Sequence, residues 1–182
     1  MNQATRPPPA SRRRRFACMI YEGILLFGVV FLAGYLLDTL TQSRHGLMWR
    51  PERQIFLFVA IGLYFLVSWR RNGQTLPMKT WGIRLADPNG QTPGFTRLLL
   101  RYLLLWPLPL LSAWLVARLS AALQSSAIDM LIVLAPFSLF IWTWFDPRGQ
   151  FLHDRILGTE LLAQPRPGPQ MPHGQPKVPP TS

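Results

Sequence analysis

Four long apolar stretches alternate with short polar segments along the chain, over residues 17–40, 54–69, 98–117 and 127–145. A helix needs about 20 mainly apolar residues to cross the hydrocarbon core of a bilayer. The second stretch is shorter than this, and it gains length if Met48 and Trp49 lie in the membrane interface. The pattern therefore predicts an all-α membrane protein with about four transmembrane helices.

The third and fourth stretches both contain proline. Pro107 and Pro109 lie in the middle of the third stretch, and Pro136 lies within the fourth. A proline removes a backbone donor and kinks a helix, which is tolerated in a membrane when neighbouring helices satisfy the freed carbonyl groups. We expect both stretches to cross as kinked helices, and the alternative for the third stretch is a segment that re-enters instead of crossing.

The polar segments differ in composition. Residues 80–86 alternate like a short strand and are followed by a turn sequence, Asp87-Pro88-Asn89-Gly90, which predicts a small cytoplasmic β-hairpin between the second and third helices. The two ends of the chain, 1–14 and 163–182, are rich in proline and hold few large apolar residues. We expect both ends to be disordered tails around one membrane domain, residues 15–162.

The composition narrows the class of protein. Of the 182 residues, 49% are apolar and 15% are charged, and Cys18 is the single cysteine. These values exclude a disordered chain, a disulfide-stabilised scaffold and most soluble enzymes. Nineteen Lys and Arg residues against eight Asp and Glu residues give a net charge of +11. Because the basic residues lie in short segments between apolar stretches, we expect contacts with anionic lipids and not with nucleic acid.

The distribution of basic residues predicts the orientation. With the N-terminus inside, cytoplasmic segments hold fifteen of the nineteen Lys and Arg residues, and the outer segments hold Arg44, Arg50, Arg53 and Arg118. Lys and Arg are retained on the cytoplasmic side of a membrane. Both termini are therefore expected to face the cytoplasm.

His153 and Asp154 are adjacent residues that could contribute to a metal site. Such a site needs a further ligand, and the other two histidines, His45 and His173, fall in an outer loop and in the C-terminal tail. The alternative is a His-Asp pair that docks the segment after the fourth helix. Since the chain also offers no evident nucleophile or nucleotide-binding loop, we predict no metal, no catalytic residue, no cofactor and no enzymatic activity.

Glu22 lies inside the first apolar stretch, where a carboxylate costs about 2.5–3.5 kcal/mol on insertion scales. Arg15 is two helical turns away, about 10 Å, which is too far for direct contact along one helix. Arg101 enters the third stretch from the same side to a similar depth, and we expect it to be the partner of Glu22. This arrangement allows either a buried ion pair that fixes helix packing or a site for a proton or cation.

Several short motifs follow one another in a defined order: Arg15-Phe-Ala, Glu22, Gly73-Gln-Thr-Leu-x-Met-Lys-Thr-Trp-x-x-Arg84-Leu, Arg101-Tyr102, and Phe151-Leu-His-Asp-Arg-x-x-Gly158-Thr159. Together, over residues 15–162, they resemble the RDD family of small bacterial membrane proteins. The resemblance implies that Arg15 matches the arginine of the family name, that Glu22 stands where its first aspartate would be, and that Asp154 is the second.

The resemblance implies a protein of the bacterial inner membrane without a cofactor, and it suggests transport of an unidentified ligand or exchange of cations and protons. In this hypothesis Glu22 binds a proton or cation, Arg15 and Arg101 adjust its pKa, and His153 with Asp154 forms a polar cytoplasmic entrance. The alternative is a structural or assembly protein in which the charged residues lock helix packing. Four helices make a small bundle for a transporter, and a homo-oligomer would supply more helices.

Overall fold

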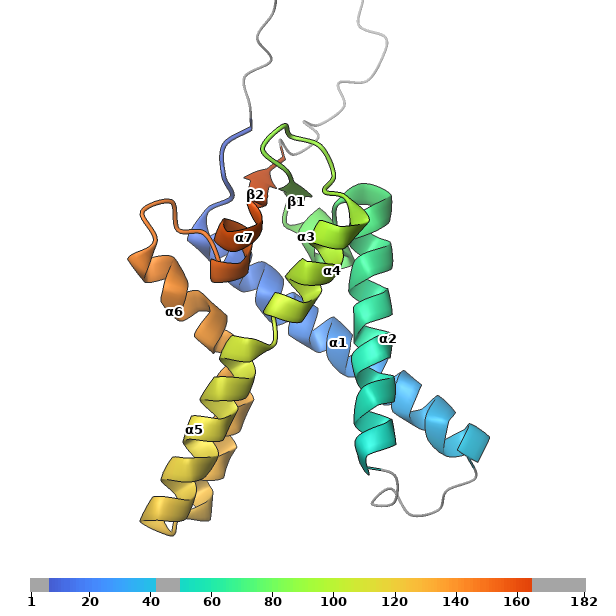
Figure 1. Cartoon of the computed structure of the whole chain (residues 1–182), viewed down its shortest axis with the longest axis vertical. Helices are drawn as coiled ribbons and strands as arrows, with labels where there is room; N and C mark the ends of the chain where they lie inside the picture. The colour runs from blue at the N-terminus through green and yellow to red at the C-terminus, as the bar shows by residue number, and fades with distance from the viewer. Residues whose placement is uncertain (1–6, 42–49, 165–182) are drawn as a thin grey trace, which may run out of the picture.

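The computed structural model describes residues 7–41 and 50–164 and contains helices and one small sheet (Figure 1). In chain order, its elements are α1 Arg12–Thr41, α2 Arg50–Asn72, α3 Leu76–Thr80, β1 Ile83–Ala86, α4 Phe95–Leu104, α5 Pro107–Leu123, the 3₁₀ helix η1 Ser126–Phe137, α6 Ser138–Phe145, α7 Leu152–Leu157 and β2 Glu160–Ala163. His45 and His173, which were predicted to lie in an outer loop and in the C-terminal tail, are outside the described residues.

Four helical segments are long and apolar enough to cross a membrane, which confirms the predicted fold class. They are Arg12–Leu40, Pro51–Asn72, Phe95–Leu123 and Ser126–Phe145. Each contains one of the four apolar stretches. The third segment comprises α4 and α5, and the fourth comprises η1 and α6.

The breaks in the third and fourth segments lie at the predicted prolines. Helix α4 ends at Leu104, and α5 begins with Pro107 at its first position, where the missing backbone N–H costs least. Pro136 lies one residue before the end of η1, and α6 continues from Ser138. Helices α5 and η1 pack along each other and run away from α1 and α2 in Figure 1.

The chain turns tightly at Gly73, between the end of α2 and the start of α3. Gly73 has a φ of +66°, and a Cβ atom at this position would lie 2.8 Å from the carbonyl oxygen of Leu85. The backbone N–H of Leu85 donates to the Gly73 carbonyl at 2.8 Å. Only glycine combines this left-handed conformation with so close an approach, and the turn brings β1 against the last residues of α2.

The sheet corrects the predicted hairpin. The strand is confirmed at Ile83–Ala86, and the turn is confirmed by the Gly90 N–H, which donates to the Asp87 carbonyl at 2.9 Å. However, β1 pairs antiparallel with β2 from the far end of the chain, in the register Ile83↔Ala163 to Ala86↔Glu160. The residues directly after the turn instead lead through Pro93 and Gly94 into α4, since proline has no N–H to donate to a strand partner.

The segment before α1 also differs from the prediction. Residues 7–14 were expected to belong to a disordered tail, but Pro8 and Ala10 bond to β2, and α1 already begins at Arg12. The Ala10 N–H donates to the Leu161 carbonyl at 2.8 Å, and the Ala163 N–H donates to the Pro8 carbonyl at 2.8 Å. The free edge of β2 holds this segment, which is why its prolines do not prevent order. Residues 1–6 and 165–182 lie outside the described part.

Buried side chains concentrate at one end of the molecule, which we call the cap: residues 7–11, α3, β1, α7 and β2, together with the adjoining ends of the long helices (Figure 1). Its core includes Trp69, Ile83, Leu85, Leu98 and Leu161. Along the spans, apolar side chains are exposed instead, as with Leu40 and Met130, both at 79%. Such a surface suits lipid, and the cap alone packs like the core of a soluble domain.

Candidate functional site

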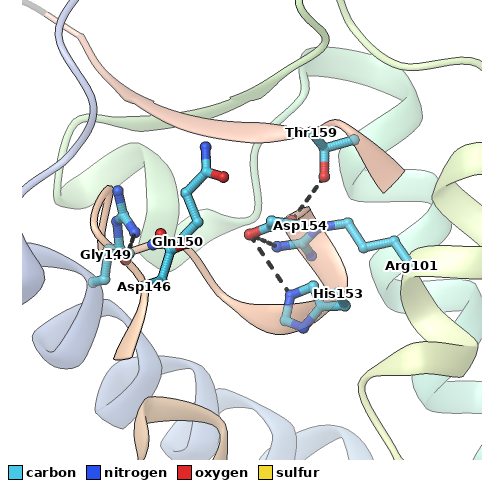
Figure 2. A network of polar contacts seen from close by, with 8 residues as sticks. Arg101, Asp146, Gly149, Gln150, His153, Asp154 and Thr159 are labelled. Atoms are coloured by element: carbon cyan, nitrogen blue, oxygen red, sulfur yellow. Dashed lines mark hydrogen bonds and ion pairs between the residues drawn. The ribbon is translucent and has the colours of Figure 1, made fainter. Parts of the chain in front are cut away.

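Asp154 is the centre of a buried polar cluster in the cap (Figure 2). Arg101 of α4 donates from Nε to Oδ1 at 2.8 Å and from Nη2 to Oδ2 at 3.3 Å. Thr159 donates its hydroxyl proton to Oδ1 at 2.8 Å. Burial alone would raise the pKa of Asp154, but Arg101 and these hydrogen bonds outweigh burial and hold it below its usual value. The carboxylate is therefore ionised and paired, and it ties α7 to α4.

His153 lies beside this pair and is only 2% exposed. Burial, the largest cause, and the nearby charge of Arg101 together lower the pKa of His153 to about 4, although Asp154 opposes the shift. The imidazole is therefore neutral at pH 7, and its contact with Asp154 at 3.7 Å is not an ion pair. The ring stacks on Phe151 with 5.4 Å between the centroids, and neither ring nitrogen has a hydrogen-bond partner among the described residues.

Asp146 organises the loop that follows α6. Its Oδ2 accepts hydrogen bonds from the backbone N–H groups of Gln150 at 2.8 Å and Arg148 at 3.0 Å, and Arg155 pairs with Oδ1. The Gln150 bond, followed by the pairing with Arg155, lowers the pKa of Asp146. The loop in turn presents the Gly149 carbonyl to Arg15, whose Nη1 donates to it. Arg15 thus joins the start of α1 to the end of the fourth span.

Glu22 has different partners from those of Asp154. Its Oε1 accepts a hydrogen bond from the Tyr64 hydroxyl of α2 at 2.6 Å, and its Oε2 accepts one from Thr75 at 2.6 Å. Thr75 is fully buried as the N-cap of α3, where its oxygen also accepts from the Met78 N–H. Two neutral hydroxyl groups, each from a different element, therefore hold one carboxylate inside the first span.

A cavity of about 740 Å³ lies among the spans below the cap. Its walls come mainly from α1, with further residues from α2, α4, η1, α6 and the cap, and most of the lining side chains are apolar. Four of the five predicted site residues contribute to it: Arg15, Glu22, Arg101 and His153. The structure therefore brings these residues to one space, although they do not all touch one another.

Two predictions about these residues are corrected. Arg101 bonds to Asp154 and not to Glu22, because α7 returns to α4 after the fourth span and supplies a nearer carboxylate. His153 and Asp154 do not form an open entrance, since both side chains are buried in the packed cap. The alternative given for them, a pair that docks the segment after the fourth helix, agrees with their position.

Several polar residues of these clusters were not identified from the sequence, among them Thr75, Tyr64 and Asp146. Thr75 was only part of a family motif, Tyr64 was one aromatic residue in an apolar stretch, and Asp146 lay in a short turn. The sequence Asp146-Pro-Arg-Gly149 has the composition of a turn and could have indicated the loop. The position of Tyr64 opposite Glu22 depends on how α1 and α2 cross, and no local pattern encodes that crossing.

The apolar helices and their polar cap define a helical membrane protein. The family model of the RDD family matches residues 9–158, and the chain therefore belongs to this family. The searches of the curated proteins and of the solved structures found no match.

Proposed function

We propose that this RDD-family protein transports a proton or cation across the membrane, with Glu22 as the group that binds it. The observation that carries this proposal is the setting of Glu22, which lies in a span and lines the cavity, and whose hydrogen bonds within the described residues come from Tyr64 and Thr75 alone. Acidic residues within membrane segments commonly mark ion pathways. Hydroxyl donors orient a carboxylate without neutralising it, so a proton or a cation can supply the missing positive charge.

We further propose that the cap faces the cytoplasm of a bacterial cell, with both termini on that side of the inner membrane. The ends of α1, α2 and α4 that meet the cap carry a dense set of basic residues: Arg12, Arg13, Arg14, Arg70, Arg71 and Arg97. This face would bind anionic lipid headgroups. Reporter fusions at Ser182 and beside Asn89 should both report a cytoplasmic position, and a periplasmic signal at either site would contradict this orientation.

Flux in sealed vesicles tests the role of Glu22. Glu22→Gln should abolish proton or cation flux per folded molecule, because the amide keeps the size of the side chain and removes its charge and its proton. Glu22→Asp should retain much of the flux, since it moves the carboxylate by one methylene. Flux is measured with a pH-sensitive dye and with Na⁺ or K⁺ gradients, for the full-length protein across a range of pH.

Asp38→Asn is the matched control for this experiment. Asp38 lies on the same helix, but it pairs with Arg53 at 3.1 Å and does not line the cavity. Asp38→Asn should therefore leave proton and cation flux unchanged. Unchanged flux in Glu22→Gln would refute the proposed transport mechanism.

A structural or assembly role is the second candidate, and the Arg101–Asp154 pair favours it. This pair joins α4 to α7, both residues are buried, and neither needs a ligand to be satisfied. In that case Glu22→Gln would reduce the yield of folded protein and show no flux defect beyond that loss. The comparison of yield with flux per folded molecule distinguishes the two candidates.

A further inference from the structure

The cavity has the size of a small-molecule site and an unusual distribution of polarity. Ligand sites commonly enclose about 300–1,000 Å³, and this one encloses about 740 Å³. Much of its wall is apolar, including Phe27 of α1, Phe65 of α2 and Val133 of η1. A sugar would leave its polar groups without partners along such a wall, whereas a hydrocarbon chain would not.

Polar groups gather where the cavity meets the cap, and three side chains there have nitrogen atoms without a hydrogen-bond partner in the described part of the chain. Arg15 Nε, Trp69 Nε1 and both nitrogens of His153 have no hydrogen-bond partner within the described residues, and their side chains are at most 4% exposed. All three residues line the cavity. Arg15 and Trp69 offer N–H groups, and a neutral imidazole offers one more. Buried donors are satisfied in folded proteins, so a ligand atom that accepts hydrogen bonds would complete this end.

The charges at this end distinguish an anionic acceptor from a neutral one. Arg101 is neutralised by its bidentate contact with Asp154, whereas Arg15 donates to an uncharged carbonyl, that of Gly149. Both oxygens of Glu22 are already bound by hydroxyl groups. Arg15 is therefore the cation placed to accompany an anion, and a charge-assisted hydrogen bond is stronger than a neutral one.

We propose that the cavity binds a single-chain amphiphile, with its acyl chain along the apolar wall and its anionic headgroup at Arg15, Trp69 and His153. Carboxylate and phosphate headgroups share the required chemistry. The proposal does not depend on ion transport through Glu22, since it concerns a separate set of side chains and a different ligand.

Binding of palmitate to the full-length protein in non-ionic detergent, followed by native mass spectrometry, tests the position of the chain. A Cβ atom at Gly23 or at Gly28 meets no described atom within 4 Å outside its own stretch of helix, but only Gly23 lines the cavity. Gly23→Phe should fill the space and weaken binding at least about tenfold, and the matched variant Gly28→Phe should bind normally. Equal binding by the two variants would overturn the proposal.

The headgroup is tested with three ligands of similar chain length: palmitate, lysophosphatidylglycerol and the uncharged monopalmitoylglycerol. At least one anionic ligand should bind more tightly than the uncharged one, and the tighter of the two identifies a carboxylate or a phosphate as the preferred group. Arg15→Gln should remove this preference, with a loss of about tenfold or more in affinity for the anion. An uncharged ligand that binds as tightly as both anions would overturn the headgroup assignment.

Trp69→Phe provides a second variant in case Arg15→Gln does not fold. It removes Nε1–H and keeps an aromatic ring beneath Arg101, which lies 4.5 Å from the Trp69 ring centroid. Its affinity for the anionic ligand should fall while its affinity for the uncharged ligand is less affected, and an equal effect on both would contradict the proposal. Flux that depends on Glu22 is measured separately. If the unmodified protein shows flux but does not bind the amphiphile, this inference is refuted and the proposed function is unaffected.

Discussion

Two acids in this protein, Asp154 in the cap and Glu22 in the first span, are held in opposite ways. Asp154 is buried against Arg101, Thr159 and His153, and Arg101 balances its charge within this cluster (Figure 2). Glu22 is held by two hydroxyl groups and faces a cavity. A charged partner fixes an acid in its ionised state, whereas neutral donors orient it and leave the charge to be balanced from elsewhere.

The difference extends to the surroundings of each acid. In the cap, β1 from the middle of the chain pairs with β2 from its C-terminal part, and the Asp154 pair adds a bond between α4 and α7. The spans near Glu22 have fewer buried side chains, and α5 with η1 diverges from α1 and α2 (Figure 1). We infer that the cap is the constant part of the structure and that any change during the proposed transport occurs among the spans.

The largest expected effect is on the cap. Arg101→Gln or Asp154→Asn should each lower the free energy of unfolding by about 3–5 kcal/mol, because each leaves a buried charge without its partner. The double variant should be less destabilised than the sum of the two single variants. Unfolding of the purified protein in detergent, induced by a denaturing detergent, measures all three.

If the losses in free energy of unfolding of the two single variants add up to the loss of the double variant, Arg101 and Asp154 act independently. That result would weaken the comparison between Asp154 and Glu22. Arg53→Gln is a suitable control, because the Arg53–Asp38 pair is partly exposed. Its loss should cost about 1 kcal/mol or less.

The pH dependence of stability should show the burial of His153. Its pKa is about 4 in the folded protein and about 6.5 in an unfolded chain, so the unfolded state binds more protons between these values. The free energy of unfolding should therefore fall by about 1.4 kcal/mol per pH unit as the pH drops from 6.5 towards 4. His153→Phe should remove this slope, and the measurement is the same unfolding assay at successive pH values.

Asp154 and Asp146, the acids of the cap, affect the free energy of unfolding at a lower pH than His153 does. The pKa values of Asp154 and Asp146 are held below normal, so their stabilisation is complete above about 4 and is lost as the pH falls further. The His153 variant should keep this second, more acidic loss. A slope between pH 6.5 and 4 that His153→Phe leaves intact would contradict a buried neutral histidine.

Of the two acids compared, Glu22 should contribute less to stability. Glu22→Gln should cost only about 0.5–1.5 kcal/mol, because the amide oxygen can still accept one of the two hydroxyl hydrogen bonds. The unfolding assay used for the cap gives a direct comparison. A loss as large as that of Asp154→Asn would mean that Glu22 is also a structural acid, and the distinction between the two sites would fail.

Local features of the sequence were enough to predict the four apolar helices and the kinks near Pro107 and Pro136. The strand before Asp87 was also predictable, because alternation and turn residues are encoded within a few positions. The length of apolar sequence needed to span a bilayer is a property of each segment alone. The site was only partly predictable: Glu22 stood out as a charge within an apolar stretch, but its hydroxyl partners did not.

The sequence by itself determined that this chain forms apolar helices long enough to span a membrane, and that Glu22 lies inside one of them. Only the tertiary structure decided which residues meet: β1 with β2, Arg101 with Asp154, and Glu22 with Tyr64 and Thr75. These contacts join positions 42 to 53 residues apart for the hydrogen-bonded side chains. Their identity depends on how the helices cross and on which partner lies nearest after packing, and neither is set by the periodicity of any one segment.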